Sequence, residues 1–145
     1  MRSPPILLHE GFTVSEEDRG RQVVRDGLLT ALRKRLKLSK SAMAVMLYAS
    51  PITYARWEAD PEVRIWADTA SKIGRFYDAA MAQLDAADAE GINLEDKIPF
   101  HIAATLLGVP QELLLRKYRE GEVHATDLGI LGLWVDRADM KKVSA

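Results

Sequence analysis

The sequence has no cysteine and few aromatic residues, with three Trp, four Tyr and three Phe among 145 residues. The absence of cysteine excludes disulfide bonds and thiolate metal sites. No apolar run approaches the ~20 residues of a membrane-spanning helix, and no basic segment followed by an apolar core marks the N-terminus. We therefore expect a cytoplasmic protein, and a hydrophobic fraction of 48% suits one domain or two very small ones.

Motifs of catalysis are also missing from the chain. His9, His101 and His124 lie far apart, without the His-x-x-x-His or His-Glu-x-x-His spacing of zinc sites. There is no glycine-rich phosphate loop and no Gly-x-Ser-x-Gly sequence. The acids in residues 86–96 fall where a helix ends and a linker begins, which indicates a solvated surface. The sequence predicts a protein that is not an enzyme and that needs no cofactor or metal.

The net charge of −1 hides two regions of opposite sign. Residues 19–40 hold eight basic residues and one acid, whereas residues 78–96 hold six acids and no base. Because DNA phosphates respond to the local field, the basic region favours a nucleic-acid surface. An apolar residue at every fourth position predicts one helix over 22–37. The last turns of this helix hold four basic residues, Arg33, Lys34, Arg35 and Lys37. They either contact DNA phosphates or simply interact favourably with the negative end of the helix dipole.

Residues 38–58, with the sequence LSKSAMAVMLYASPITYARWE, predict two short helices that meet at a tight turn. Ser39 is the expected N-cap of the first helix, over 40–48, which has apolar residues at helical spacing. Ser50 is the expected N-cap of the second helix, over 51–59. That helix opens with proline, which is tolerated there because the N–H it lacks would be unpaired anyway.

This run resembles the helix-turn-helix of the lambda and 434 repressors, whose pattern is roughly Leu-Thr-Gln-x-x-Leu-Ala-x-x-Leu-Gly-Val-Ser-x-x-Thr-Ile-x-x-Trp-Glu. The positions that match or nearly match are Leu38, Ser39, Met43, Ala44, Leu47, Ala49, Ser50, Thr53, Arg56, Trp57 and Glu58. Lys40 stands where the pattern has Gln, and Tyr48 stands where it has Gly, often a left-handed position. The resemblance covers residues 26–77 and implies a helical DNA-binding domain.

Helical spacing assigns the two faces of the second helix. Tyr54 and Trp57 should turn inward, and Arg56 should point outward as the one strong donor, able to pair with guanine or a phosphate. Ile52 is placed to touch a thymine methyl group, and Thr53 to donate to a phosphate or to bond back to its own helix. The DNA contacts predicted for this domain are Arg33, Lys34, Arg35, Lys40, Ser50, Pro51, Ile52, Thr53, Ala55 and Arg56.

Residues 98–143 predict a second unit with two helices, a hairpin and a short last helix. The order resembles the winged helix of the excisionase and MerR type, on the residues Ala103, Leu106, Leu107, Gly108, Val109, Arg116, Gly121, Gly129, Trp134 and Asp139. Its wing, residues 125–135, carries one acid and no base, so we do not expect the wing to enter the minor groove. The apolar hairpin tip is instead expected to pack on the domain or on a partner.

The second helix of this unit offers further DNA contacts. Gln111 is placed to recognise adenine, and Arg116, Lys117 and Arg119 are placed to bind phosphates. The alternative is a structural helical domain whose basic face is simply solvated.

These features together predict a mainly α protein. It has a flexible arm at 1–20, a helix-turn-helix domain with a long linker helix at 21–90, a linker at 91–97 and a winged-helix-like domain with one β-hairpin at 98–145.

The combination resembles the immunity repressors of temperate phages, in particular those of actinobacteriophages with two DNA-binding domains. That resemblance implies transcriptional repression that maintains lysogeny in the cytoplasm of a bacterial host. The implied partner is double-stranded operator DNA, with a monomer on an asymmetric site favoured over a homodimer. The alternatives are an excisionase-like factor that bends DNA, and a Cro-like or antitoxin-like protein-interaction module.

Overall fold

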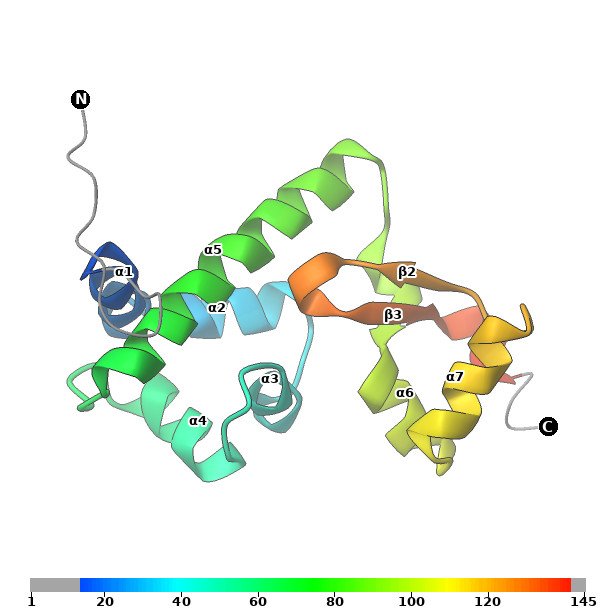
Figure 1. Cartoon of the computed structure of the whole chain (residues 1–145), viewed down its shortest axis with the longest axis horizontal. Helices are drawn as coiled ribbons and strands as arrows, with labels where there is room; N and C mark the ends of the chain where they lie inside the picture. The colour runs from blue at the N-terminus through cyan, green and yellow to red at the C-terminus, as the bar shows by residue number, and fades with distance from the viewer. Residues whose placement is uncertain (1–13, 142–145) are drawn as a thin grey trace. The chain divides into compact units, whose positions relative to one another are not determined.

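The structure, a computed structural model, describes residues 14–141 and is mainly helical with a small three-stranded antiparallel sheet (Figure 1). The chain divides into two compact units, residues 1–81 and 82–145, and the boundary falls inside helix α5 (Ala67–Ala89). None of the helices within residues 14–141 combines the length and the apolar character that crossing a membrane requires.

The first unit contains four short helices and the N-terminal part of α5. The short helices are α1 (Val14–Arg25), α2 (Leu28–Arg35), α3 (Lys40–Met46) and α4 (Pro51–Ala59). The single helix predicted over 22–37 is wrong, because the chain breaks between α1 and α2 at Gly27, whose φ of 70° is left-handed. The apolar spacing that suggested one helix continues across the break.

Helices α1 and α5 approach each other closely enough that their backbones nearly touch. A Cβ atom at Gly20 would collide with the carbonyl group of Ala70, and one at Gly74 would collide with the carbonyl oxygen of Glu16. Glycine is therefore required at both positions of the crossing. Residues 14–20 belong to this packed helix, so the flexible arm predicted at 1–20 does not extend to them. Residues 1–13 of that arm lie outside the described part of the chain.

The two short helices predicted from residues 38–58 are confirmed as α3 and α4. The Oγ atoms of Ser39 and Ser50 each accept a hydrogen bond at 3.1 Å, from the backbone N–H groups of Ala42 and Thr53. Helix α3 ends at Met46, two residues before its predicted end at 48, because the chain turns through Tyr48 with a φ of 54°. Both predicted N-caps are thus confirmed.

The second unit contains the C-terminal part of α5 and a small sheet with two helices. Its elements are η2 (Leu94–Asp96), β1 (Lys97–Pro99), α6 (Phe100–Leu107), α7 (Gln111–Arg119), β2 (Ala125–Asp127), η3 (Gly129–Leu131), β3 (Leu133–Asp136) and η4 (Arg137–Asp139). The core joins strands and helices through Ile98, Ala103, Ala104, Leu114, Val123 and Val135.

The predicted hairpin is present as β2 and β3, but it is not the whole sheet. Strand β1 pairs with the other edge of β3, with Ile98 opposite Val135, so the strand order is β1-β3-β2. The prediction of one hairpin was incomplete because it missed β1. This strand has only three residues and ends in proline, and three residues are too few to show the alternating pattern of a strand. Part of this strand falls in the segment predicted as a linker at 91–97.

The left-handed turn at Tyr48 yields a stability prediction. Tyr48→Gly should raise the free energy of unfolding by about 1 kcal/mol, because glycine adopts a positive φ without the penalty that a side chain carries. Tyr48→Ala removes the same ring but keeps a Cβ atom, so it should give no gain. Denaturant unfolding of both variants checks this. An equal gain for both would show that the ring, not the backbone, is unfavourable there.

Candidate nucleic-acid interface

Helix α4 has an inner face that belongs to the core of its unit. Tyr54 and Trp57 are both buried, as their spacing predicted. Their rings meet edge to face, with centroids 6.1 Å apart and planes at 70°. This geometry suits the quadrupoles of two aromatic rings and fixes the rotation of the helix about its own axis.

A buried ion pair ties the same face of α4 to the end of α2. The Nε and Nη2 atoms of Arg33 donate to the two carboxylate oxygens of Glu58 at 2.7 and 3.0 Å. Arg33 Nη1 also donates to the carbonyl oxygen of Leu38 at 3.1 Å. The two side chains are only 15% and 5% exposed. Arg33 thus uses three of its five N–H groups within the fold, on Glu58 and on the Leu38 carbonyl, so its main observed role is structural and its contact with DNA stays a prediction.

The pair shifts the pKa values of both partners and of Tyr54. Burial raises the pKa of the Glu58 carboxyl, but the interactions with Arg33, and to a smaller extent with Tyr54 and Thr30, together lower it by more, so the net pKa is below the ordinary value. The bond to Glu58 raises the pKa of the Arg33 guanidinium. Burial, with the nearby Glu58 charge, raises the pKa of the Tyr54 hydroxyl. The three groups therefore hold fixed charge states at neutral pH.

The outer face of α4 and its neighbours presents cations to solvent. Arg56 on α4, Lys34 on α2 and Lys40 on α3 are exposed, and the side chain of none of them has a hydrogen bond or ion pair with a residue that the structure describes. Arg35 is exposed as well, but it has partners, among them the Met81 sulfur at 3.9 Å from Nη1. Three cations of the predicted set thus remain available for phosphate or base contacts.

The remaining predicted positions on α4 are polar or apolar rather than charged. Ser50, Pro51, Ile52 and Thr53 are exposed, and Ala55 is half-buried. The Ser50 hydroxyl caps the helix, since it accepts a hydrogen bond from the Thr53 N–H and donates one to the Thr53 hydroxyl at 2.8 Å. The N-terminal turn of α4 therefore offers a rigid surface with the apolar side chain of Ile52 on it.

Helix α7 in the second unit carries the other predicted contacts. Gln111, Arg116 and Arg119 are exposed, and none of their side chains has a hydrogen bond or ion pair with a partner among residues 14–141. Lys117 Nζ lies 2.8 Å from a carboxylate oxygen of Glu122, which raises the pKa of that lysine. Lys117 is therefore less available to a phosphate than its two arginine neighbours.

The hairpin tip of the second unit is largely a packed structure. Leu128 and Leu131 are buried, and Trp134 Nε1 donates to the Leu131 carbonyl oxygen at 3.0 Å. A Cβ atom at Gly129 would meet Nε2 of Gln83 on α5 at 2.6 Å, so the tip lies against that helix. Leu128 and Leu131 of the predicted tip are thus packed within the chain, whereas Ile130 is 50% exposed, so packing on a partner stays an open prediction for it.

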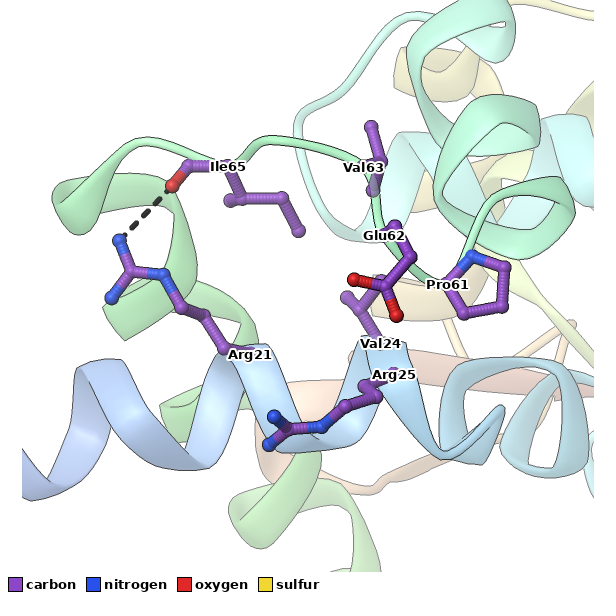
Figure 2. A pocket seen from close by; sticks show the side chains of 7 residues that line it. All are labelled: Arg21, Val24, Arg25, Pro61, Glu62, Val63 and Ile65. Carbon is purple, nitrogen blue, oxygen red and sulfur yellow. Dashed lines mark hydrogen bonds between the residues drawn. The ribbon is translucent and has the colours of Figure 1, made fainter.

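A small hollow lies between α1 and the segment before α5 (Figure 2). It has a volume of about 150 Å³ and is lined by Arg21, Val24, Arg25, Pro61, Glu62, Val63 and Ile65. Arg21 is already engaged, since it pairs with Glu17 and donates to the Ile65 carbonyl oxygen at 3.1 Å. Ligand pockets are usually several hundred Å³ in volume, so this hollow is too small for a typical small-molecule site.

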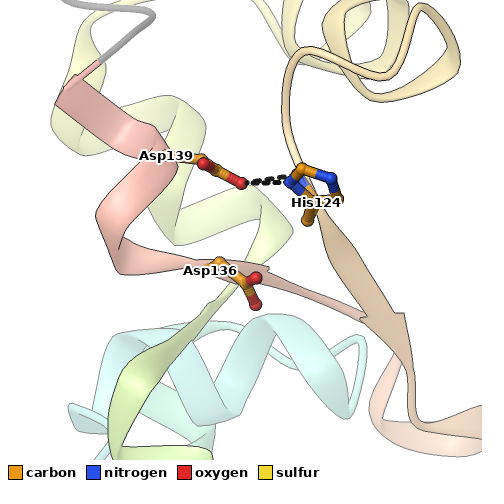
Figure 3. A group of neighbouring side chains, drawn as sticks. All are labelled: His124, Asp136 and Asp139. Carbon is orange, nitrogen blue, oxygen red and sulfur yellow. Dashed lines mark hydrogen bonds and ion pairs between the residues drawn. The ribbon is translucent and has the colours of Figure 1, made fainter.

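His124, Asp136 and Asp139 form a cluster that sequence spacing did not indicate (Figure 3). One ligand atom from each lies within 4.8 Å of the others. Asp139 accepts from the backbone N–H of His124 at 2.8 Å and lies 2.9 Å from its Nδ1 atom. Asp136 lies 2.6 Å from Nζ of Lys97. Both carboxylates therefore already have donors: Asp139 on η4 binds the residue before β2, and Asp136 on β3 binds Lys97 on β1.

Comparison with protein-family models, with curated proteins and with solved structures gave no match for this chain.

The pairing of Arg33 with Glu58 predicts a difference between neighbouring arginine and lysine residues. Arg33→Ala should lower the free energy of unfolding by about 3 kcal/mol, because it leaves the Glu58 carboxylate buried without its partner. Lys34→Ala is the matched control, since this exposed neighbour has no described partner, and it should change stability by less than about 0.5 kcal/mol. Denaturant unfolding measures both. Equal effects would contradict the structural role of Arg33.

The lowered pKa of Glu58 predicts a dependence on pH. A lowered pKa in the folded protein means that the unfolded chain binds more protons as the pH falls. The stability that the Glu58 carboxylate contributes is therefore complete above the ordinary pKa of 4.5, and it is lost as the pH falls through the lowered pKa. Glu58→Gln should be less stable at neutral pH, and its free energy of unfolding should fall less steeply below pH 4.5. Parallel pH curves for the two proteins would contradict the assignment.

Proposed function

We propose that the chain is a sequence-specific, double-stranded DNA-binding protein that acts as a transcriptional repressor. The observation that carries the proposal is the division of α4 into two faces. Its inner face is fixed by Tyr54, Trp57 and the pair between Arg33 and Glu58. Its outer face leaves Arg56 exposed and without a described partner.

The chemistry of this outer face fits the major groove of B-DNA. The groove admits an α-helix, and an arginine guanidinium pairs with the O6 and N7 atoms of guanine. Lys34 and Lys40, on the two preceding helices, supply the cations that phosphate contacts require. The overall charge of −1 does not oppose this binding, because the acids gather elsewhere in the sequence.

The second unit supplies a further candidate surface on α7. Gln111 would recognise adenine, while Arg116 and Arg119 would bind phosphates. Two binding units on one chain gain affinity because docking of one raises the effective concentration of the other. This supports a monomer on a long asymmetric site. It also suits the phage immunity repressors that the sequence resembles, which would place the protein in a bacterial cytoplasm and make maintenance of lysogeny its role.

The proposal is tested by selecting bound duplexes from a random DNA pool with the intact chain. Enrichment of a defined sequence is expected. The absence of enrichment at physiological salt, where sequence-independent phosphate binding is weakened, would contradict sequence-specific binding. The same selection with Arg56→Ala should yield a motif that is relaxed at one position, because one base contact is lost.

Quantitative binding to the selected duplex separates base contacts from phosphate contacts. Arg56→Ala should weaken binding to that duplex by ~1–3 kcal/mol and leave binding to random DNA nearly unchanged. Lys40→Ala should weaken binding to both duplexes alike and reduce the slope of log affinity against log salt by about 1. Fluorescence anisotropy at several salt concentrations measures these quantities. A uniform loss for Arg56→Ala would make it a phosphate contact instead.

A further inference from the structure

The turn between α3 and α4 carries a tyrosine whose placement the fold does not explain. Tyr48 has a φ of 54°, a left-handed conformation, and its side chain is 99% exposed. A non-glycine residue is disfavoured in this region of backbone space, and an exposed ring recovers nothing through burial. Strained residues of this kind gather at functional sites, because the strain is retained when the side chain has a task.

Two further apolar side chains are exposed on either side of this turn. Val45 near the end of α3 is 53% exposed, and Ile52 in the first turn of α4 is 76% exposed. The six exposed large apolar side chains of the described chain include three within residues 45–52. The turn itself is firmly held, since the N–H of Tyr48 donates to the carbonyl oxygen of Val45 at 3.1 Å. These three residues form an apolar rim at the start of α4.

We propose, on the basis of the function proposed above, that Tyr48 and Ile52 recognise thymine 5-methyl groups beside the base that Arg56 contacts. The thymine methyl is the apolar group that base pairs present in the major groove. The tyrosine ring offers a large rigid surface with few torsions to immobilise, and its hydroxyl can meet water or a phosphate. The selected sequence should therefore carry thymines next to the position that Arg56 specifies.

Charge is what favours DNA over a protein as the occupant of the apolar rim. The charged side chains on α2, α3 and α4 that are exposed and have no described partner are the cations Lys34, Lys40 and Arg56. A partner that covers the rim must also neutralise these cations, which a phosphate backbone on either side of a groove does. A hydrophobic protein surface would leave them desolvated without a counter-charge.

The test replaces each thymine of the selected duplex, one at a time, with deoxyuridine, which removes only the methyl group. The affinity of the intact chain should fall about 4-fold when the thymine at one or two positions is replaced. This is the fold-change that corresponds to about 0.8 kcal/mol for one buried CH₂ or methyl group. At each of those positions the substitution should have no effect on one of the two variants, Tyr48→Gly or Ile52→Ala, because the side chain that met that methyl group is gone. Lys40→Ala, the matched control, should bind more weakly but keep the full sensitivity to deoxyuridine.

The outcomes distinguish this inference from the proposed function. Selective binding that no deoxyuridine weakens would overturn the thymine contact and leave the DNA-binding proposal standing. A sensitivity that persists in both the Tyr48→Gly and Ile52→Ala variants would assign the methyl contact to other residues and overturn the inference as well. If no duplex is bound selectively, the proposed function fails and the thymine contact fails with it.

Discussion

The ion pair between Arg33 and Glu58 is the interaction on which the candidate interface depends. It joins α2 to α4 through two hydrogen bonds of 2.7 and 3.0 Å between side chains that are 15% and 5% exposed. Burying two charges is unfavourable unless their hydrogen bonds are satisfied, and the third bond from Arg33 to the Leu38 carbonyl helps to satisfy them. With its inner face held in this way, α4 can present only its opposite face to a partner.

The basic stretch at residues 19–40 therefore serves two purposes. Arg33 is used inside the unit, whereas Lys34 and Lys40 remain exposed without described partners. A similar division exists on α7, where Lys117 pairs with Glu122 and its neighbour Arg116 stays available. Net charge along a sequence thus overstates the cations that a nucleic acid can meet, because some of them are consumed by the fold.

Local signals predicted the helices that begin with strong caps. Ser50 followed by proline predicted the start of α4, and helical spacing placed Tyr54 and Trp57 on its inner face. The break at Gly27 escaped prediction because the apolar spacing runs through it on both helices. Strand β1 escaped because it has three residues and is defined by its partner β3.

The errors at the candidate site have the same origin in long-range contacts. Arg33 and Glu58 are 25 positions apart, and no local pattern connects them. The link between His124 and Asp139 likewise requires the folded sheet. Exposure of Arg56 followed from helical spacing alone, but the freedom of its guanidinium depends on which acids the fold brings near it. Sequence therefore identified the face, and the structure determined which cations on it are available.

The most direct test of two DNA-binding units on one chain is a hydroxyl-radical footprint on the selected duplex. The intact chain should protect an asymmetric site longer than one helical turn of about 10 bp, the distance that separates the centres of two adjacent half-sites. A chain carrying both Arg116→Ala and Arg119→Ala should keep the part of the footprint that α4 makes and lose the rest. A footprint that is symmetric, or that is unchanged in this variant, would contradict the account.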